Sequence, residues 1–332
     1  MKISLLDYAA RDEGMNSQQA FQASTELAQL ADQLGYHRFW IAEHHNVPVL
    51  ATSAPEIMIA HLANKTTHIR IGSGGVMLPN YSSYKVAEVF KTLEALHPGR
   101  IDAGVGNSPG GDKVVSQALN EGKTEKPNYA DQVDDLAGFL SDSLPKGHAY
   151  KNRRARPIIE TTPPMFILAA SGRNAELAAR NGSGFVFAHF IRPDVAVGRD
   201  AITAYRDAFK PTKLAEKPHT IVAVFALVGE TKEDAEDMLR AFELWHLSSV
   251  SRTRAVYNMP TPEKARTITY TEEEEASLKE TRKRIVYGTA QEVKQQLLDL
   301  QVAYGADEIM ITPNAYSIEK RKQTIRLLAE VL

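Results

Sequence analysis

Short runs of β-branched and aromatic residues alternate with longer amphipathic segments along the whole chain. In the longer segments apolar residues recur at i, i+3 and i+4, as at Leu27, Leu30, Ala31 and Leu34, which predicts helices with one buried face. The short runs have the composition of buried strands. The predicted strands are Lys2–Leu6, Arg38–Ala42, Ile69–Leu78, Ile101–Gly106, Pro164–Ala170, Gly184–Ala188, Thr220–Val228 and Asp307–Thr312. The predicted helices are Ser17–Leu34, Ala54–Lys65, Tyr84–Leu96, Tyr129–Leu140, Asn174–Asn181, Ala196–Phe209, Lys232–Leu247 and Ile318–Val331.

Eight successive strand-then-helix units, with no repeat of fixed length, predict an α/β fold of the (β/α)8 TIM-barrel type. A two-domain, doubly wound protein is the alternative. That alternative needs a linker, and no stretch rich in Pro, Gly or Ser lies at mid-chain. We therefore expect one barrel domain over residues 1–332.

A polar, proline-containing stretch, Ser248–Tyr287, separates the seventh and eighth predicted strands. Loops that follow barrel strands build the catalytic face, so this insertion is a candidate lid over an active site. A solvated insertion with its own exposed helix around Glu272–Arg284 is equally compatible with the sequence.

The composition excludes several classes of functional site and partner. The 332 residues include no cysteine, which excludes disulfide scaffolds, cysteine-ligated metals and cysteine nucleophiles. A net charge of −2 argues against a nucleic-acid partner. Asp7 and Arg11 interrupt the first apolar residues, and no run approaches the roughly 20 apolar residues of a membrane span. The sequence thus indicates a cytoplasmic protein without membrane association.

The strongest chemical signal is Glu43-His44-His45, at the end of the second predicted strand. That end of a barrel strand lies on the catalytic face, where an imidazole can exchange protons near neutral pH and a carboxylate can orient it. Successive side chains of a strand point to opposite sides, so only one of the two rings can enter the barrel mouth. A metal-binding histidine pair and a purely structural, hydrogen-bonded histidine are the alternatives; we expect no metal site.

Adjacent glycines, Gly74 and Gly75, interrupt the third predicted strand. Such glycines mark either a place where a ligand, for example a flat aromatic cofactor, approaches the backbone or a tight barrel corner. A further glycine-rich segment around Asn107 follows the fourth strand. It contains neither a GxGxxG fingerprint nor a P-loop, which argues against a nicotinamide-binding domain.

Ser171-Gly172-Arg173-Asn174 stand where a predicted strand ends and a helix begins. Unpaired backbone N–H groups, a hydroxyl and a guanidinium at a helix start can bind a phosphate. Ordinary helix capping by Ser171 or Asn174 is the alternative.

Four motifs follow one another along the chain: Glu-His-His, the Gly-Gly pair followed by Leu-Pro, the segment Leu96-His-Pro-Gly-Arg100 and the Ser-Gly-Arg turn. In this order they resemble the bacterial luciferase-like flavin monooxygenases, in particular their single-chain, alkanal-monooxygenase-like branch. The resemblance is dense over the first half of the chain, continues through the Ser-Gly-Arg turn and thins towards the C-terminus.

The resemblance implies FMN at the C-terminal mouth of a TIM barrel, reduced to FMNH2 by a separate NAD(P)H:flavin reductase, and O2 as co-substrate. In this likeness His44, with Glu43 beside it, matches the active-site histidine that assists oxygen chemistry at the flavin. Gly74 and Gly75 match the bulge under the flavin ring, where relatives have a non-prolyl cis peptide, and Ser171 to Asn174 match the phosphate turn. Many relatives have arginine where this chain has Asn107, so we expect flavin binding here to be either weakened or retuned.

The aromatic residues near the sixth strand end, Phe187, His189 and Phe190, are candidate walls for a small, apolar organic substrate, whereas Trp245 has the spacing of a core residue. The resemblance also implies a homodimer formed through the helices beside the second and third strands. Two other functions stay open: a hydride-transfer enzyme that uses the deazaflavin F420 on the same fold, and a non-catalytic flavin-binding protein.

Overall fold

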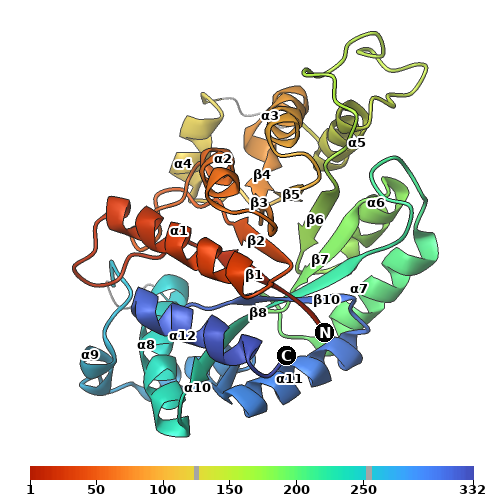
Figure 1. Ribbon diagram of the computed structural model, residues 1–332. Coiled ribbons are helices and arrows are strands. Elements are labelled where there is room, and N and C mark those ends of the chain that lie inside the picture. Colours follow the sequence, from red (N-terminus) through yellow and green to blue (C-terminus); the bar gives the residue numbers. More distant parts are fainter. Residues whose placement is uncertain (123–126, 252–255) are drawn as a thin grey trace.

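A closed barrel of parallel strands forms the centre of the computed structural model, which describes residues 1–122, 127–251 and 256–332 (Figure 1). The last barrel strand pairs with both the first and the seventh, and these two pairings close the barrel. The predicted (β/α)8 barrel is therefore confirmed. Its wall consists of β1 (Lys2–Asp7), β2 (Arg38–Ile41), β3 (Arg70–Ser73), β5 (Ile101–Gly106), β6 (Met165–Ala169), β7 (Gly184–Ala188), β8 (Thr220–Gly229) and β10 (Glu308–Thr312).

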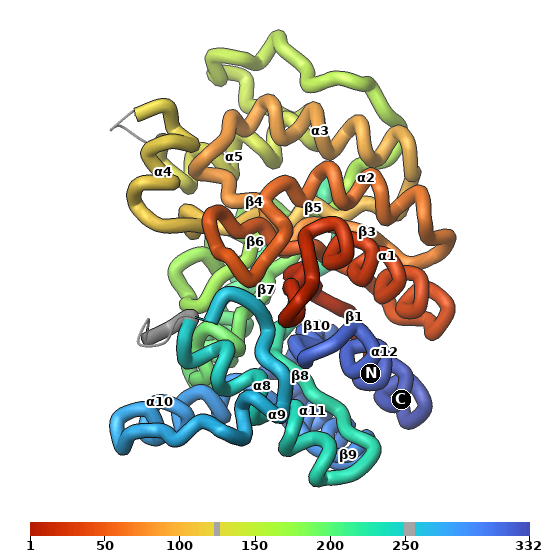
Figure 2. The backbone as a smooth tube through the Cα atoms, turned by 90° about the vertical axis from the view of Figure 1, so that its left-hand side faces the viewer, coloured from red at the N-terminus to blue at the C-terminus, as the bar shows by residue number. Residues whose placement is uncertain are grey.

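Helices surround the barrel, and the two views in Figures 1 and 2 show them on its outside. Most of them begin close to a predicted start, and capping residues such as Asn16 and Ser82 accept a hydrogen bond from the first turn. They are α1 (Ser17–Gln33), α2 (Pro55–Lys65), α3 (Ser83–Leu96), α5 (Tyr129–Leu140), α6 (Ala175–Arg180), α7 (Val195–Ala208), α8 (Lys232–Ser251), α11 (Ala290–Tyr304) and α12 (Ile318–Ala329), with the short α4 (Lys113–Leu119) in the loop after β5.

The structure corrects the sequence expectation in two regions. The predicted strand Ile69–Leu78 is divided into β3 and β4 (Val76–Met77) by the two glycines, and β4 pairs with β5. The end of the predicted insertion is also wrong: residues 285–287 open a further strand, β9 (Ile285–Thr289), which pairs with the outer half of β8, and α11 then leads to β10.

Between α8 and β9 the insertion holds two short helices, α9 (Pro262–Arg266) and α10 (Glu272–Arg282). The helix expected around Glu272–Arg284 is thus present. Its buried face carries Leu278 and Thr281, and it packs on α8 and β9 rather than being fully solvated. Residues 252–255 of the predicted lid lie outside the described residues.

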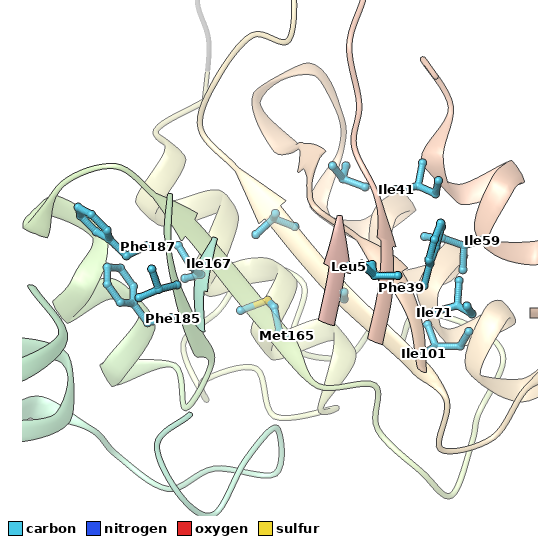
Figure 3. Packing of buried hydrophobic residues seen from close by; sticks show 14 of the residues in the cluster. Leu5, Phe39, Ile41, Ile59, Ile71, Ile101, Met165, Ile167, Phe185 and Phe187 are labelled. Atoms are coloured by element: carbon cyan, nitrogen blue, oxygen red, sulfur yellow. The ribbon is translucent and has the colours of Figure 1, made fainter. Parts of the chain in front are cut away.

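Strand alternation divides the apolar core into two layers. Leu5 of β1 belongs to the layer between the strands and the outer helices, while Leu6 belongs to the layer inside the barrel. Figure 3 shows part of the outer layer, where Ile167, Phe185 and Phe187 pack together. Any inward-facing position near a strand's C-terminal end therefore faces the barrel mouth.

The opposite, N-terminal end of the barrel is closed by a buried ionic network. Asp102 of β5 lies 2.7 Å from both Arg38 Nη1 and Arg70 Nη2, and Arg38 Nε lies 3.0 Å from Glu308 Oε1. Burial alone would raise the pKa of Asp102, but Arg38 and Arg70 outweigh it and lower that pKa. The charged residues of this network are paired with one another, so the candidate catalytic residues are to be sought at the mouth.

Across the described ranges, no helix combines the length and apolar character needed to cross a membrane.

Candidate active site at the barrel mouth

Aromatic rings converge where β1, β2, β7 and β8 end. The ring centroid of Tyr8 lies 5.2 Å from that of His44, 6.4 Å from that of Phe190 and 6.3 Å from that of Phe225. Phe225 extends the row to Trp245 of α8, 6.3 Å away. These five side chains, hereafter the aromatic mouth, form an apolar surface at the C-terminal end of the barrel.

His44 is the polar group in this surface. Its backbone N–H donates to the carbonyl of Thr52 at 3.0 Å, which holds the chain after β2, and its ring Nδ1 is buried with no hydrogen-bond partner among the described residues. Burial, and secondly the charge of His45, lower the pKa of His44 to about 4. The imidazole is therefore neutral at neutral pH.

Glu43 points away from His44. Its Oε1 accepts hydrogen bonds from His45 Nε2 at 2.7 Å and from the Tyr81 hydroxyl at 2.9 Å, and its Oε2 accepts one from the Met77 backbone N–H at 3.0 Å. Burial raises the pKa of Glu43 in spite of these three donors. The carboxylate thus orients His45 and the turn after β4; an interaction between Glu43 and His44 is not formed.

The Gly74–Gly75 peptide bond is cis. A Cβ atom on Gly74 would lie 2.5 Å from Leu6 Cδ1, and one on Gly75 would lie 3.0 Å from the Gly104 backbone. Both glycines are therefore required by close packing at this corner of the barrel, where β3 and β4 meet β5. The space beside each glycine is filled by protein atoms, so packing at this corner is by itself a reason for the pair.

The predicted phosphate turn follows β6 as a 3-10 turn, Gly172–Asn174, and then α6. Neither Ser171 nor Asn174 caps a helix with its side chain, so ordinary capping does not explain these residues. Arg173 is exposed. Asn107, also exposed, follows β5, the strand that pairs with β6, so the two segments are neighbours at the mouth.

Two of the three predicted wall residues face the wrong way. Phe187 lies in the outer layer, 5.6 Å from the Tyr304 ring of α11. His189 is 5% exposed; its Nδ1 accepts from the Tyr304 hydroxyl at 2.6 Å and its Nε2–H donates to the Lys283 carbonyl at 2.8 Å. Both ring nitrogens are used for structure. Only Phe190 of the three reaches the aromatic mouth; Phe187 faces outward on β7, and the turn after β7 directs His189 towards Tyr304.

Sequence reasoning missed Tyr8 and Phe225, although an available signal marks both. Tyr8 follows inward-facing Leu6 by two positions, and Phe225 follows inward-facing Ala223 by two. Trp245 is 5% exposed and packs on Phe242, as expected for a core residue. No group of side chains suited to a metal ion occurs within the part of the chain that the structure describes.

A parallel barrel whose mouth carries a glycine corner, a turn without side-chain caps and a neutral histidine defines the class of the protein as a (β/α)8-barrel protein. Residues 1–308 match the luciferase-like monooxygenase family, and the chain belongs to that family.

Several proteins resemble the whole chain. Uncharacterized protein YceB of Bacillus subtilis is 42% identical over 99% of this chain and 98% of its own length. The N-acetyl-S-alkylcysteine monooxygenase of the same organism is 38% identical over 97% and 95%, respectively. Among solved structures, apo-MsnO8 is 35% identical and superposes with a TM-score of 0.87 over 99% of this chain and 96% of that one. These matches span each chain almost end to end.

Proposed function

We propose that the protein is an FMN-dependent, two-component monooxygenase that uses FMNH2 and O2 to oxygenate a small, apolar organic substrate. It would act on paired donors with incorporation of molecular oxygen. The observation that carries this proposal is the neutral His44 beside the aromatic rings of the mouth; its buried Nδ1 has no hydrogen-bond partner among the residues that the structure describes. Family membership supports the oxygenase reaction class.

The residues at the mouth fit FMN. Arg173 and the uncapped turn from Ser171 to Asn174 supply a positive charge and polar groups for the phosphate. The sequence likeness matches the Gly74–Gly75 corner to the flavin ring, and the exposed Asn107 offers an amide without a charge. When bound in its reduced form, FMN supplies the activation of O2.

The chain's own residues would bind, orient and shield. Tyr8, Phe190 and Phe225 exclude water from the reacting groups, and His44 Nδ1 accepts or releases a proton at the mouth. Glu43 acts one layer behind, since it fixes His45 and the Met77 backbone rather than a reacting atom.

A reductase partner and a homodimer belong to the same proposal. The chain has no nicotinamide fingerprint, and a relative in Acinetobacter baylyi, 26% identical over 71% of this chain and 67% of its own, is named as the oxygenase component of a flavin-dependent trigonelline monooxygenase. We place the dimer contact on the α2 and α3 side, where Ile57 and Leu96 are 67% and 63% exposed. The expected compartment is the cytoplasm.

The whole chain would act as one barrel domain, with residues 248–287 as its lid. The described part of that insertion touches the loop after β1: the Met259 N–H donates to the Arg11 carbonyl at 2.7 Å, and the Met259 carbonyl accepts from the Glu13 N–H at 3.0 Å. Lys264 Nζ lies 3.0 Å from Glu13 Oε1. The same loop begins with Tyr8, so the insertion is joined directly to the aromatic mouth.

Flavin titration followed by oxygen uptake tests the proposal. FMN should bind far more tightly than riboflavin, Arg173→Gln should remove most of that preference, and Arg180→Gln, which alters the exposed Arg180–Asp134 pair on α6, should not. With FMNH2 supplied by a reductase, oxygen uptake should increase with a suitable substrate. Equal affinity for the two flavins would refute the phosphate turn. Hydride exchange with F420 would favour the deazaflavin alternative, and FMN binding without any turnover would favour the non-catalytic one.

A further inference from the structure

A cavity lies outside the barrel wall, apart from the aromatic mouth. Its volume is about 530 Å³, which is within the range of small-molecule sites in proteins. It is lined by the start of α3, by one face of α5 and by the loop that follows α5. None of the described residues in its wall belongs to the aromatic mouth. The proposed function leaves this cavity without a role.

The loop that covers the cavity is long and firmly held. Residues 141–164 contain no helix or strand and lie at the periphery beside α5 (Figures 1 and 2), whereas most connections in compact domains are about 4–6 residues long. Lys91 of α3 is fully buried, and its Nζ donates to the Ala155 carbonyl at 3.2 Å. The Tyr84 hydroxyl donates to the Arg154 carbonyl at 3.0 Å. Long ordered loops of this kind are typical of functional segments.

Three aromatic rings line the cavity. The ring centroids of Tyr84 and Phe139 are 5.0 Å apart and the two rings are nearly perpendicular. The ring centroid of Tyr150 lies 6.4 Å from that of Phe139. Phe139 is buried, whereas Tyr150 is 55% exposed and is contributed by the covering loop. Since aromatic rings pack well in offset and edge-on contacts, this part of the wall suits a flat aromatic ligand.

The charges at the cavity favour an anionic group. Arg153 lines the wall, is exposed, and forms no ion pair with a described carboxylate. It belongs to the basic run Lys151-Asn-Arg-Arg-Ala-Arg156. Of the described residues in the wall, only Asp135 carries a carboxylate, and its Oδ1 lies 2.9 Å from His148 Nε2. The guanidinium of Arg153 is therefore free to bind a phosphate, for which arginine is well suited.

The wall also contains a buried amide. Gln132 is 5% exposed, and its Nε2 donates to the carbonyls of Leu78 and Tyr81 at 3.2 Å and 3.0 Å. These two acceptors fix the orientation of the amide, and its Oε1 has no partner among the described residues. An unpaired buried acceptor calls for an explanation, and a ligand that brings hydroxyl donors to this wall supplies one.

We propose that this cavity is a second binding site for a small aromatic phosphate with hydroxyl groups, which is the chemistry of a nucleotide. The aromatic ring packs on Tyr84, Phe139 and Tyr150, and the phosphate binds Arg153. Adenine and flavin nucleotides share this chemistry, so both are used as probes. The inference goes beyond the proposed function and does not depend on it, because it concerns a site outside the barrel mouth.

Isothermal titration of the full chain with AMP and adenosine, without flavin, tests the adenine nucleotide. The wild type should bind one AMP per chain at least about tenfold more tightly than adenosine. Arg153→Gln should reduce AMP affinity about tenfold and leave adenosine affinity nearly unchanged. Tyr150→Leu should weaken both ligands alike, because it removes ring contact and no charge.

Two matched variants show where the probe binds. Arg154→Gln removes the same charge one residue away, from a side chain outside the cavity wall, and should change the ratio of AMP to adenosine affinity by less than about threefold. Arg173→Gln alters the phosphate turn at the mouth and should leave that ratio unchanged. Because the readout is a ratio, a general loss of folding does not imitate the expected result.

A titration with FMN tests the flavin nucleotide in the same way. Two FMN molecules per wild-type chain, one lost in Arg153→Gln and the other in Arg173→Gln, support the second site. The inference is overturned if AMP does not bind at millimolar concentration and FMN binds only once. It is also overturned if Arg173→Gln, and not Arg153→Gln, removes the preference for AMP. Neither result affects oxygen uptake with FMNH2, so the monooxygenase proposal stands or falls separately.

Discussion

Replacing His44 with glutamine should remove a destabilisation that appears only at acid pH. Burial lowers the pKa of His44 from 6.5 to about 4 in the folded protein. Below the unfolded value the unfolded chain binds a proton that the folded chain does not, so stability is complete above 6.5 and falls as the pH decreases towards 4. At about pH 5 the two pKa values give a loss of about 2 kcal/mol from this residue.

The assay is urea unfolding at about pH 7 and about pH 5 for the wild type and for His44→Gln. The wild type should lose about 2 kcal/mol more than the variant between the two conditions, whatever the variant's stability at neutral pH. Other groups that titrate, such as the half-buried His246, act equally in both proteins and cancel in the difference. His68→Gln, an exposed replacement, is the control and should follow the wild type.

Identical pH dependence in His44→Gln and the wild type would refute the buried, neutral imidazole. The same variant tests the chemical role. If His44 exchanges a proton during turnover, substrate-dependent oxygen uptake at neutral pH should fall by about 10²–10⁴-fold, while FMN still binds. Turnover at the wild-type rate would remove His44 from the mechanism and leave the stability result unaffected.

Three further results are expected. Glu43→Gln replaces one acceptor oxygen by a donor, so it should cost about 1–3 kcal/mol in urea unfolding and weaken FMN binding; unchanged FMN affinity would show that Glu43 does not support the flavin site. Asp102→Asn should cost about 3–5 kcal/mol because it leaves buried guanidinium charge uncompensated, whereas the exposed Asp134→Asn should cost about 0–1 kcal/mol; similar losses would contradict the buried network. Trypsin cleavage at Lys264 and Arg266 should slow when FMN and substrate bind, and a ligand-independent rate would leave a simple surface insertion in place of a lid.

The barrel could be predicted from the sequence because its strands and helices have different periods. Each of the eight wall strands was predicted within a few residues, since a buried parallel strand is a nearly continuous apolar run. The helix α11 was not predicted. Thr289 and Glu292 form a capping box at its start, and this local signal is independent of apolar spacing. The strand β9 is short, and the charged residues before it obscured its Ile-Val-Tyr core.

Site residues were predicted with unequal success for a physical reason. A residue near the C-terminal end of a strand lies at the mouth. Whether its side chain faces inward depends on whether it is an even or an odd number of residues from a position that faces inward. Phe187 and His189 lie near the end of β7 as predicted, but their side chains do not face the mouth. Phe190 lies near that end and faces the mouth. Glu43 accepts a hydrogen bond from the Met77 backbone N–H. Met77 comes within reach of Glu43 because the predicted third strand is divided at Gly74 and Gly75 into β3 and β4. No local pattern encodes that contact.

The distribution of unpaired polar atoms inside the barrel gives a further reason to place the ligand at the mouth. At the closed end, Arg38, Asp102 and Glu308 bind one another, so a ligand there would have to compete with charged hydrogen bonds that are already formed. At the mouth, His44 Nδ1 and Thr312 Oγ1 have no hydrogen-bond partner among the described parts of the chain. A ligand that supplies matching groups gains hydrogen bonds without breaking any, and the surrounding rings keep water from doing the same. Binding free energy is therefore available at the C-terminal end, beside the one neutral imidazole that the proposed reaction requires.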